Sequence, residues 1–191
     1  MNKFWWQHPA KAIDLLAQQA AEARQQQLTK PLGALGQLET IAIRLAGMQG
    51  NICPRIQTPW ISIFAADHGV TVEGVSAYPS EVTAQMVANF STGGAAICVL
   101  SRHIGAAFEV VDVGVASDTS VFRGVIQDKS QQGTDNFLVQ AAMTSTALDI
   151  ALNAGRSAVQ RAIAIGADCF IGGEMGIGNT SSAALLMACL T

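Results

Sequence analysis

Residues 60–69 read WISIFAADHG, and this stretch decides the fold class. Trp60 to Ala66 is an apolar run of the kind found in strands that are buried on both faces of a parallel sheet. The polar triplet Asp67-His68-Gly69 follows directly. Because ligands bind beyond the carboxyl ends of the strands in open parallel sheets, the stretch predicts a central strand that leads into a candidate site.

Strand-like and helix-like segments alternate along the rest of the chain. Apolar runs predict further strands at 108–113, 124–127 and 169–171, and the segments 80–90, 91–104, 144–165 and from 179 onward predict helices. This alternation predicts an α/β fold, a Rossmann-like parallel sheet with flanking helices.

Two helices are predicted before the first strand. Residues 11–27 contain neither Gly nor Pro and are rich in Ala, Gln and Leu, while residues 34–48 place their apolar side chains mostly on one helical face. We expect residues 1–50 to form an N-terminal helical element, a small domain or dimerisation element, and residues 51–191 to form an incomplete α/β domain.

Composition excludes several classes of protein. The 191 residues are 50% hydrophobic and 13% charged, but no run reaches the roughly 18 apolar residues of a membrane span. Residues 1–10 lack the apolar stretch of a signal peptide, so a cytoplasmic protein is expected. The 11 basic residues do not cluster and the net charge is −3, which argues against nucleic-acid binding. The expected partner is a small molecule or a second copy of the chain.

The four cysteines are spread along the sequence without a CxxC motif. Most lie in apolar surroundings, so we interpret them as buried free thiols rather than metal ligands or redox centres.

The Asp67-His68-Gly69 triplet has two readings. A His beside a carboxylate at a strand end is a candidate base or ligand-binding group, and the same triplet is also typical of a turn. No second His or Cys lies nearby, so a metal site is not expected. Asp112, at the end of the strand predicted at 108–113, similarly suits either a ribose hydroxyl or the capping of a loop.

The glycine-rich segment from Gly172 to Thr180, GGEMGIGNT, is a candidate phosphate site. Its glycines allow close approach of backbone N–H groups to an anion, and the helix that follows presents its positive end. It lacks GK[ST], and Ser181 replaces the third glycine of the dinucleotide fingerprint. The carboxylate of Glu174 would repel a phosphate, so it is expected to face a ribose hydroxyl, a cationic ring or a ring N–H, or else solvent.

Two further segments offer candidates. Lys30 and Gly33, in TKPLGALG, suit an anion contact or a structural turn. Tyr78 and Met86 suit either an aromatic pocket wall or core packing.

Four blocks of the sequence, in order, resemble a single enzyme family. They read LTKPLGALGQLETIAIRLAGMQG, FAADHGVTVEGVSAYPSEVTAQMVANFSTGGAAICVL, VVDVG and GGEMGIGNTSSAA. The sequence resembles the nicotinate-nucleotide–dimethylbenzimidazole phosphoribosyltransferases from Leu28 to its last residue.

The resemblance implies a glycosyltransferase (pentosyltransferase) of cobalamin biosynthesis. Such an enzyme transfers the 5-phosphoribosyl group of nicotinate mononucleotide to 5,6-dimethylbenzimidazole and gives α-ribazole 5′-phosphate and nicotinate. It also implies a homodimer that needs no metal or redox cofactor. The family's general-base Glu is expected beyond Thr191, so residues 1–191 alone are expected to be inactive.

The resemblance also suggests roles for individual residues. Tyr78 and Met86 match the wall of the benzimidazole pocket, where better-known members carry Ser and Gln, so a more apolar pocket is expected. Glu174, Met175 and Gly176 match residues around the nucleotide and the base.

The remaining matches concern the phosphate and the first strand end. The phosphate is expected at Gly176, Gly178, Asn179 and Thr180. Asp67 and His68 match a family motif and are expected to bind substrate, but the resemblance assigns them no chemical role.

Two other functions stay open at this point. A non-enzymatic module that binds a nucleotide or base would use the same loops, while a dehydrogenase is disfavoured by the missing third glycine. Residues 181–191, SSAALLMACLT, are apolar nearly all round, as in a buried helix. No later residue of the sequence covers them, so a truncated domain is expected.

Overall fold

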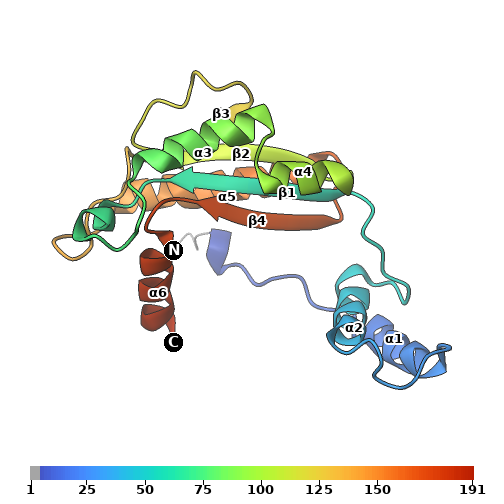
Figure 1. Cartoon of the computed structure of the whole chain (residues 1–191). Helices are drawn as coiled ribbons and strands as arrows, with labels where there is room; N and C mark the ends of the chain where they lie inside the picture. The colour runs from blue at the N-terminus through green and yellow to red at the C-terminus, as the bar shows by residue number, and fades with distance from the viewer. Residues whose placement is uncertain (1–4) are drawn as a thin grey trace. The chain divides into compact units, whose positions relative to one another are not determined.

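A computed structural model describes residues 5–191 of the chain. The chain divides into two compact units, Met1–Arg55 and Ile56–Thr191. The first unit holds η1 (Trp5–Gln7), α1 (Leu15–Gln27) and α2 (Gln37–Gln49). Figure 1 shows α1 and α2 side by side as a helical hairpin.

Local capping sets the ends of these helices. The side chain of Asp14 accepts a hydrogen bond from the N–H of Ala17, so α1 begins at Leu15 rather than at the predicted Lys11. α2 ends at Gly50, which adopts the left-handed conformation that favours glycine. Between the helices, the ammonium of Lys30 lies 2.7 Å from the carboxylate of Glu39.

The second unit is built on a parallel sheet. Its described strands are β1 (Pro59–Ala66), β2 (Ala107–Gly114), β3 (Val125–Gln127) and β4 (Cys169–Met175), in the order β3-β2-β1-β4. β1 pairs in parallel with β2 and β4, and β2 with β3. The α/β prediction is confirmed, and WISIFAA forms most of a central strand.

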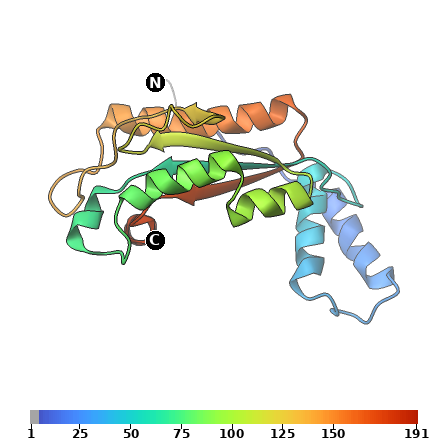
Figure 2. The same ribbon diagram turned by 45° about the horizontal axis from the view of Figure 1, so that its top comes forward.

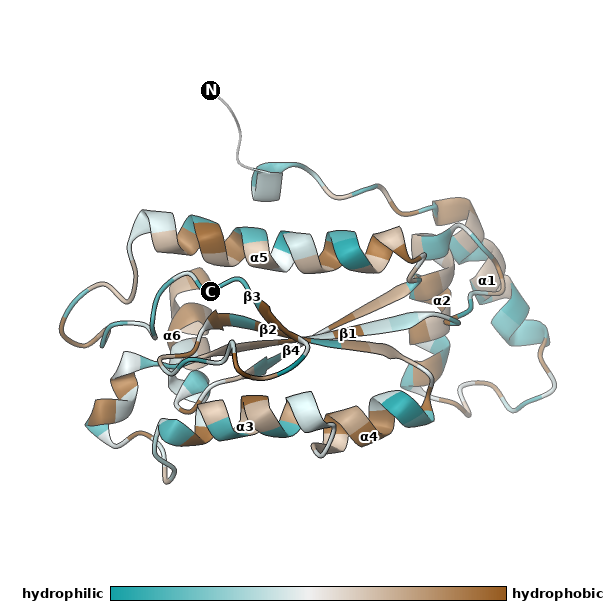
Figure 3. Cartoon of the chain, turned by 90° about the horizontal axis from the view of Figure 1, so that it is seen from above, coloured by the Kyte–Doolittle hydropathy of each residue, from teal (hydrophilic) through white to brown (hydrophobic). Residues whose placement is uncertain are grey.

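Helices cover both faces of this sheet. Figure 3 shows α3 (Glu81–Thr92) and α4 (Ala96–His103) on one face and α5 (Ser145–Ala164) on the other. Figure 2 shows that the strands run toward the end of the unit where η2 (Gly69–Glu73) and α6 (Asn179–Leu190) lie. The carboxyl ends of the strands therefore lie next to Asp67-His68-Gly69 and the glycine-rich segment, the two candidate site segments predicted from the sequence.

The two faces of the sheet are packed differently. On the side of α3 and α4, an apolar core joins Ile61, Ile63 and Val110 to Val87 and Phe90. On the side of α5, the sheet carries a buried ionic contact between β2 and α5. The buried carboxylate of Glu109 accepts hydrogen bonds from the guanidinium of Arg161 and from the hydroxyl of Ser62.

The structure corrects the boundaries predicted for two segments. α3 continues to Thr92 and ends at Gly93, whose φ is +77°, so the next helix begins at Ala96 rather than at Ser91. β4 continues to Met175, because its residues from Gly172 onward pair with Ser62–Ala65 of β1. The first part of the glycine segment is therefore strand and not loop.

The end of the chain also differs from expectation. α6 begins at Asn179, as predicted, and follows Gly178 without a side-chain cap. None of its residues is buried, and Leu186 and Leu190 are 62% and 82% exposed. The predicted burial of this helix is not met within the described chain, because no described element covers its outer side.

The prediction of buried thiols is mostly wrong. Cys98 is buried in the core, Cys169 is half-buried, and Cys53 and Cys189 are exposed; all four are free. Sequence context misleads here because Cys189 lies on the exposed α6.

Candidate functional site

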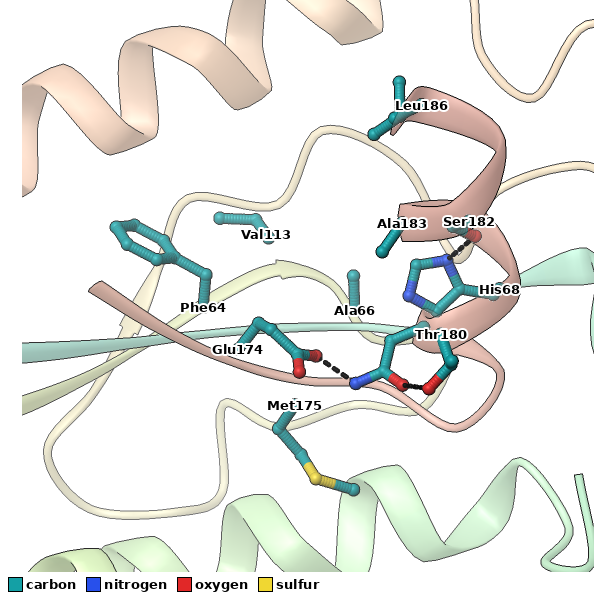
Figure 4. Close-up of a pocket in the computed structure, with 11 residues that line it drawn as sticks. Phe64, Ala66, His68, Val113, Glu174, Met175, Thr180, Ser182, Ala183 and Leu186 are labelled. Carbon is teal, nitrogen blue, oxygen red and sulfur yellow. Dashed lines mark hydrogen bonds between the residues drawn. The ribbon is translucent and has the colours of Figure 1, made fainter. Parts of the chain in front are cut away.

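A cavity of about 480 Å³ opens at the carboxyl ends of the strands, beside α6 (Figure 4). Strand residues form one part of its wall, and the first turns of α6 form the other. The lining residues are Phe64, Ala66, His68, Val113, Glu174, Met175, Asn179, Thr180, Ser182, Ala183 and Leu186. The cavity thus has an apolar wall with a few convergent polar groups, as small-molecule sites do.

The end of β4 divides its side chains between two faces. Successive residues of a strand point to opposite sides. Figure 4 shows the carboxylate of Glu174 on the cavity side, while the side chain of Met175 extends toward the opposite face. There Met175 packs against the apolar core. The side-chain amide of Asn179 donates a hydrogen bond to the carboxylate of Glu174. This bond holds Glu174 at the N-terminus of α6.

The turn between β4 and α6 requires its glycines. A Cβ on Gly176 would lie 2.2 Å from the carbonyl oxygen of Ala66 and 2.8 Å from Nε2 of His68. Gly178 has φ of +87°, which L-residues rarely adopt. The N–H of Ile177 donates to the hydroxyl of Thr83 on α3 at 3.1 Å. These contacts bring the turn directly against the end of β1.

The imidazole of His68 lies against this turn. Its Nδ1 is 3.0 Å from the hydroxyl oxygen of Ser182 on α6. Burial lowers the pKa of His68 below its usual value, and the nearby carboxylates of Glu174 and Asp67 oppose that shift without cancelling it. The ring is therefore neutral at neutral pH.

Asp67 is not among the residues that line this cavity. Its buried carboxylate accepts a hydrogen bond from the N–H of Ala116 at 2.8 Å. Its backbone N–H donates to Gly114, and its carbonyl oxygen accepts from Thr134. Asp67 thus ties the end of β1 to the loops that follow β2 and β3. Its role is to hold these loops in place next to the site.

Asp112 also stabilises a loop. Its fully buried carboxylate accepts from the N–H groups of Gly114 and Val115 and from the hydroxyl of Thr119, and it lies 3.2 Å from the ammonium of Lys129. Of the two readings of Asp112, the structure supports loop capping.

The residues expected to form the benzimidazole wall lie elsewhere. Tyr78 is 66% exposed just before α3, and Met86 packs against the apolar core. Neither lines the cavity that contains Glu174. Lys30 and Gly33 belong to the first unit, where Lys30 pairs with Glu39.

Several lining residues were not selected from the sequence. Phe64 and Val113 belong to strands, whereas Ser182, Ala183 and Leu186 belong to α6. Ser182 lies three positions after Asn179, a spacing that puts both on one face of a helix. This spacing could have indicated that Ser182 shares the site with Asn179. It becomes informative only in the structure, where His68 contacts Ser182.

A family model described as "Phosphoribosyltransferase" matches residues 10–191. The chain belongs to this phosphoribosyltransferase family. The nicotinate-nucleotide–dimethylbenzimidazole phosphoribosyltransferase of Pseudomonas fluorescens strain SBW25 is 54% identical over 190 residues, covering 100% of this chain and 54% of the relative. The enzyme of that name from Chromobacterium violaceum is 53% identical over 182 residues, covering 95% of this chain and 53% of the relative.

Solved structures agree with this phosphoribosyltransferase assignment. A crystal structure of nicotinate-nucleotide–dimethylbenzimidazole phosphoribosyltransferase from Thermus thermophilus matches with a TM-score of 0.87 and 47% identity, over 93% of this chain and 54% of that chain. A structure of CobT from the same organism matches with a TM-score of 0.85. The chain spans about half the length of the curated relatives it matches.

Among residues 5–191, no group of three or more His, Cys, Asp or Glu is arranged to hold a metal ion. No helix in the same range has the length and apolar character needed to cross a membrane.

Proposed function

We propose that the protein containing this chain transfers the 5-phosphoribosyl group of nicotinate mononucleotide to 5,6-dimethylbenzimidazole. The products are α-ribazole 5′-phosphate and nicotinate, and the ribosyl carbon is inverted from β to α. The observation that carries this proposal is the match along the whole chain to relatives of that name. We assign the reaction to the cavity between Glu174 and α6, whose size and lining support this choice.

The nucleotide is assigned to this cavity. Its phosphate is placed at Gly176, Gly178, Asn179 and Thr180, where the first turn of α6 presents its positive end. Support comes from Gly176 and Gly178, which carry no side chain between the turn and a ligand, and Gly176 packs closely against Ala66.

The rest of the nucleotide and the base are placed around β4. Glu174 is assigned to the ribose or the ring, because its carboxylate suits a hydroxyl, an N–H or a cationic ring. The base is assigned to the region of Met175, Tyr78 and Met86. Met175 and Met86 both pack against the core on the α3 face of the sheet.

The chemistry suits a site of this kind. The nicotinate ring leaves from a cationic state, so its departure needs little acid catalysis. The incoming azole must lose its N–H proton, and a carboxylate with a raised pKa in a dry pocket is a suitable base. We assign that base to a Glu outside residues 1–191. No metal or redox cofactor takes part in this scheme.

The test compares two lengths of the protein. The protein at its full encoded length and residues 1–191 alone are incubated with both substrates, and α-ribazole 5′-phosphate is measured by liquid chromatography and mass spectrometry. Product is expected from the longer protein and not from residues 1–191. Turnover by residues 1–191 would overturn the placement of the base. Nucleotide binding without turnover by the longer protein would favour a non-enzymatic binding module.

We also propose that the protein works as a cytoplasmic homodimer without nucleic-acid or membrane partners. Exposed apolar side chains on α2, Leu38, Ile41 and Met48, support an interface on the first unit. Light scattering of the longer protein after size exclusion is expected to give twice the monomer mass. A monomer mass at assay concentration would contradict this proposal.

A further inference from the structure

We propose that His68 binds the phosphate of the nucleotide through Nε2, and that Ser182 is the positioning residue that holds its ring. This inference rests on the proposed function, since it assigns a ligand contact within the same cavity. It gives a role to a histidine that the sequence analysis left without one.

The first support is where the ring lies. A Cβ on Gly176 would lie 2.8 Å from Nε2 of His68, and a Cβ on Gly178 would lie 3.7 Å from Cβ of His68. The imidazole therefore borders the two glycines to which the phosphate is assigned. His68 and Glu174 are the titratable side chains that line the cavity. Of the two, the carboxylate of Glu174 repels an anion, so His68 is the one that can bind it.

The second support is the orientation of the ring. Nδ1 lies 3.0 Å from the hydroxyl of Ser182, whereas no hydrogen bond joins Nε2 to another described residue. Figure 4 shows Nε2 turned into the cavity. A serine hydroxyl donates or accepts, so Ser182 holds this pose both for a neutral ring that accepts at Nδ1 and for a protonated ring that donates there.

The third support is the electrostatic setting. The ionisable groups facing the imidazole are Asp67 and Glu174. α6 contains no charged residue, and on the loop after β3 the ammonium of Lys129 bonds to Asp112 and to backbone oxygens. The ring is neutral in the free protein because burial dominates. A phosphate dianion beside Nε2 adds negative charge and raises the pKa of His68, so binding is accompanied by proton uptake.

The direction of the pH effect follows from this linkage. The pKa of His68 is higher in the nucleotide complex than in the free protein. Between those two values, each unit fall in pH strengthens nucleotide binding up to about tenfold, and above the pKa of the complex the effect vanishes. The phosphate itself titrates near pH 6, so the comparison must be made with a variant whose side chain cannot titrate.

His68→Gln is that variant, because the glutamine amide keeps a neutral donor near the position of Nε2. Calorimetry of the full-length protein with nicotinate mononucleotide, in two buffers of different ionisation enthalpy near pH 7, gives the number of protons taken up. We expect uptake in the wild type and in His103→Gln, an exposed histidine on α4, and a clear loss of uptake in His68→Gln. Equal uptake in His68→Gln would overturn the proposal.

Two ligand analogues separate phosphate from carboxylate. Nicotinamide mononucleotide lacks the carboxylate and is expected to keep the proton uptake. Nicotinate riboside lacks the phosphate and is expected to lose it. Uptake that follows the carboxylate instead would overturn the assignment to phosphate. Because proton uptake is a binding measurement, it is independent of turnover, which tests the proposed function separately.

The role of Ser182 needs a readout that a purely structural residue would not affect. In histidine-labelled protein, the ring carbon shifts of His68 report its pKa with and without nucleotide. Binding is expected to raise this pKa, Ser182→Ala to reduce the rise, and Ser182→Thr to restore it. The wild-type titration also tests the proposal if His68→Gln fails to fold, because an unchanged pKa on binding would overturn it.

Discussion

The side-chain amide of Asn179 donates a hydrogen bond to the carboxylate of Glu174, five residues earlier in the chain. This bond crosses the turn from β4 into α6 and fixes the carboxylate at the cavity. A carboxylate that faces a glycine turn and a helix N-terminus would repel a phosphate placed there. Its position beside the turn suits a neighbouring part of the ligand, such as the ribose.

Glu174→Gln is expected to lower kcat/KM of the full-length protein about tenfold or more. The substitution removes a charged hydrogen-bond acceptor, which is typically worth about 1.5–3 kcal/mol. Steady-state kinetics with varied nicotinate mononucleotide measures the change, and Glu22→Gln on the exposed part of α1 is the matched control. Unchanged kinetics for Glu174→Gln would remove Glu174 from the site.

Gly176→Ala is expected to destabilise the protein by about 1–3 kcal/mol, the usual cost of overpacking. Its Cβ would meet the carbonyl oxygen of Ala66 at 2.2 Å, and a backbone atom cannot turn aside as a side chain does. Gly172→Ala in β4, the strand just before the turn, is the control, since its Cβ would meet only Phe170, at 3.8 Å.

Urea unfolding measures both glycine variants, and nucleotide binding is measured in parallel. Gly176→Ala is expected to lose binding as well as stability, whereas Gly172→Ala keeps both. Equal stability of the two variants would mean that the turn moves away from β1 at little cost.

The sheet was predictable because each strand contains or begins with a mostly apolar run, and WISIFAA in β1 is the longest of these. The start of α5 has a similar local signal in the sequence. Thr144 precedes a long helical pattern, and its hydroxyl accepts a hydrogen bond from the N–H of Ala147. In both cases the deciding information is local in the sequence.

The site was less predictable because its contacts join distant segments. Asp67 follows β1 and Asp112 lies near the end of β2, and both resemble ligand-binding carboxylates. Each instead accepts a hydrogen bond from a backbone N–H of the loop after β2. Glycines are unfavourable in strands, so Gly172 and Gly173 were read as loop, whereas pairing with β1 holds them in β4. Periodicity carries no information about such partners.

Arg161→Met is expected to lower the free energy of unfolding by about 2 kcal/mol. The guanidinium donates two hydrogen bonds to Glu109, whose side chain is 8% exposed, and its loss leaves that carboxylate without a countercharge. Urea unfolding measures the loss, and Arg123→Met at an exposed position is the control. Adding Glu109→Gln to Arg161→Met should recover part of the stability. No recovery would show that packing of the arginine stem, and not the buried charge, sets the cost.

Asp168→Asn is expected to destabilise the protein at neutral pH but not in acid. The carboxylate of Asp168 accepts from the N–H groups of Gln57 at 2.7 Å and Thr58 at 2.9 Å, which ties the start of β1 to β4. These two hydrogen bonds lower the pKa of Asp168. A carboxyl whose pKa is lower in the folded than in the unfolded protein stabilises the fold above the unfolded value, near pH 4, and this stabilisation is lost as pH falls through the folded value.

The wild type and Asp168→Asn should therefore differ in unfolding free energy at pH 7 and converge below about pH 4. Urea unfolding at a series of pH values measures this difference, with Asp149→Asn on α5 as the control. The amide of Asn accepts through one oxygen and presents an NH₂ group to the second backbone N–H, so neutral pH is where the substitution costs most. A difference that stays constant from pH 7 to pH 3 would show that the amide's geometry, and not the lost charge, causes the destabilisation.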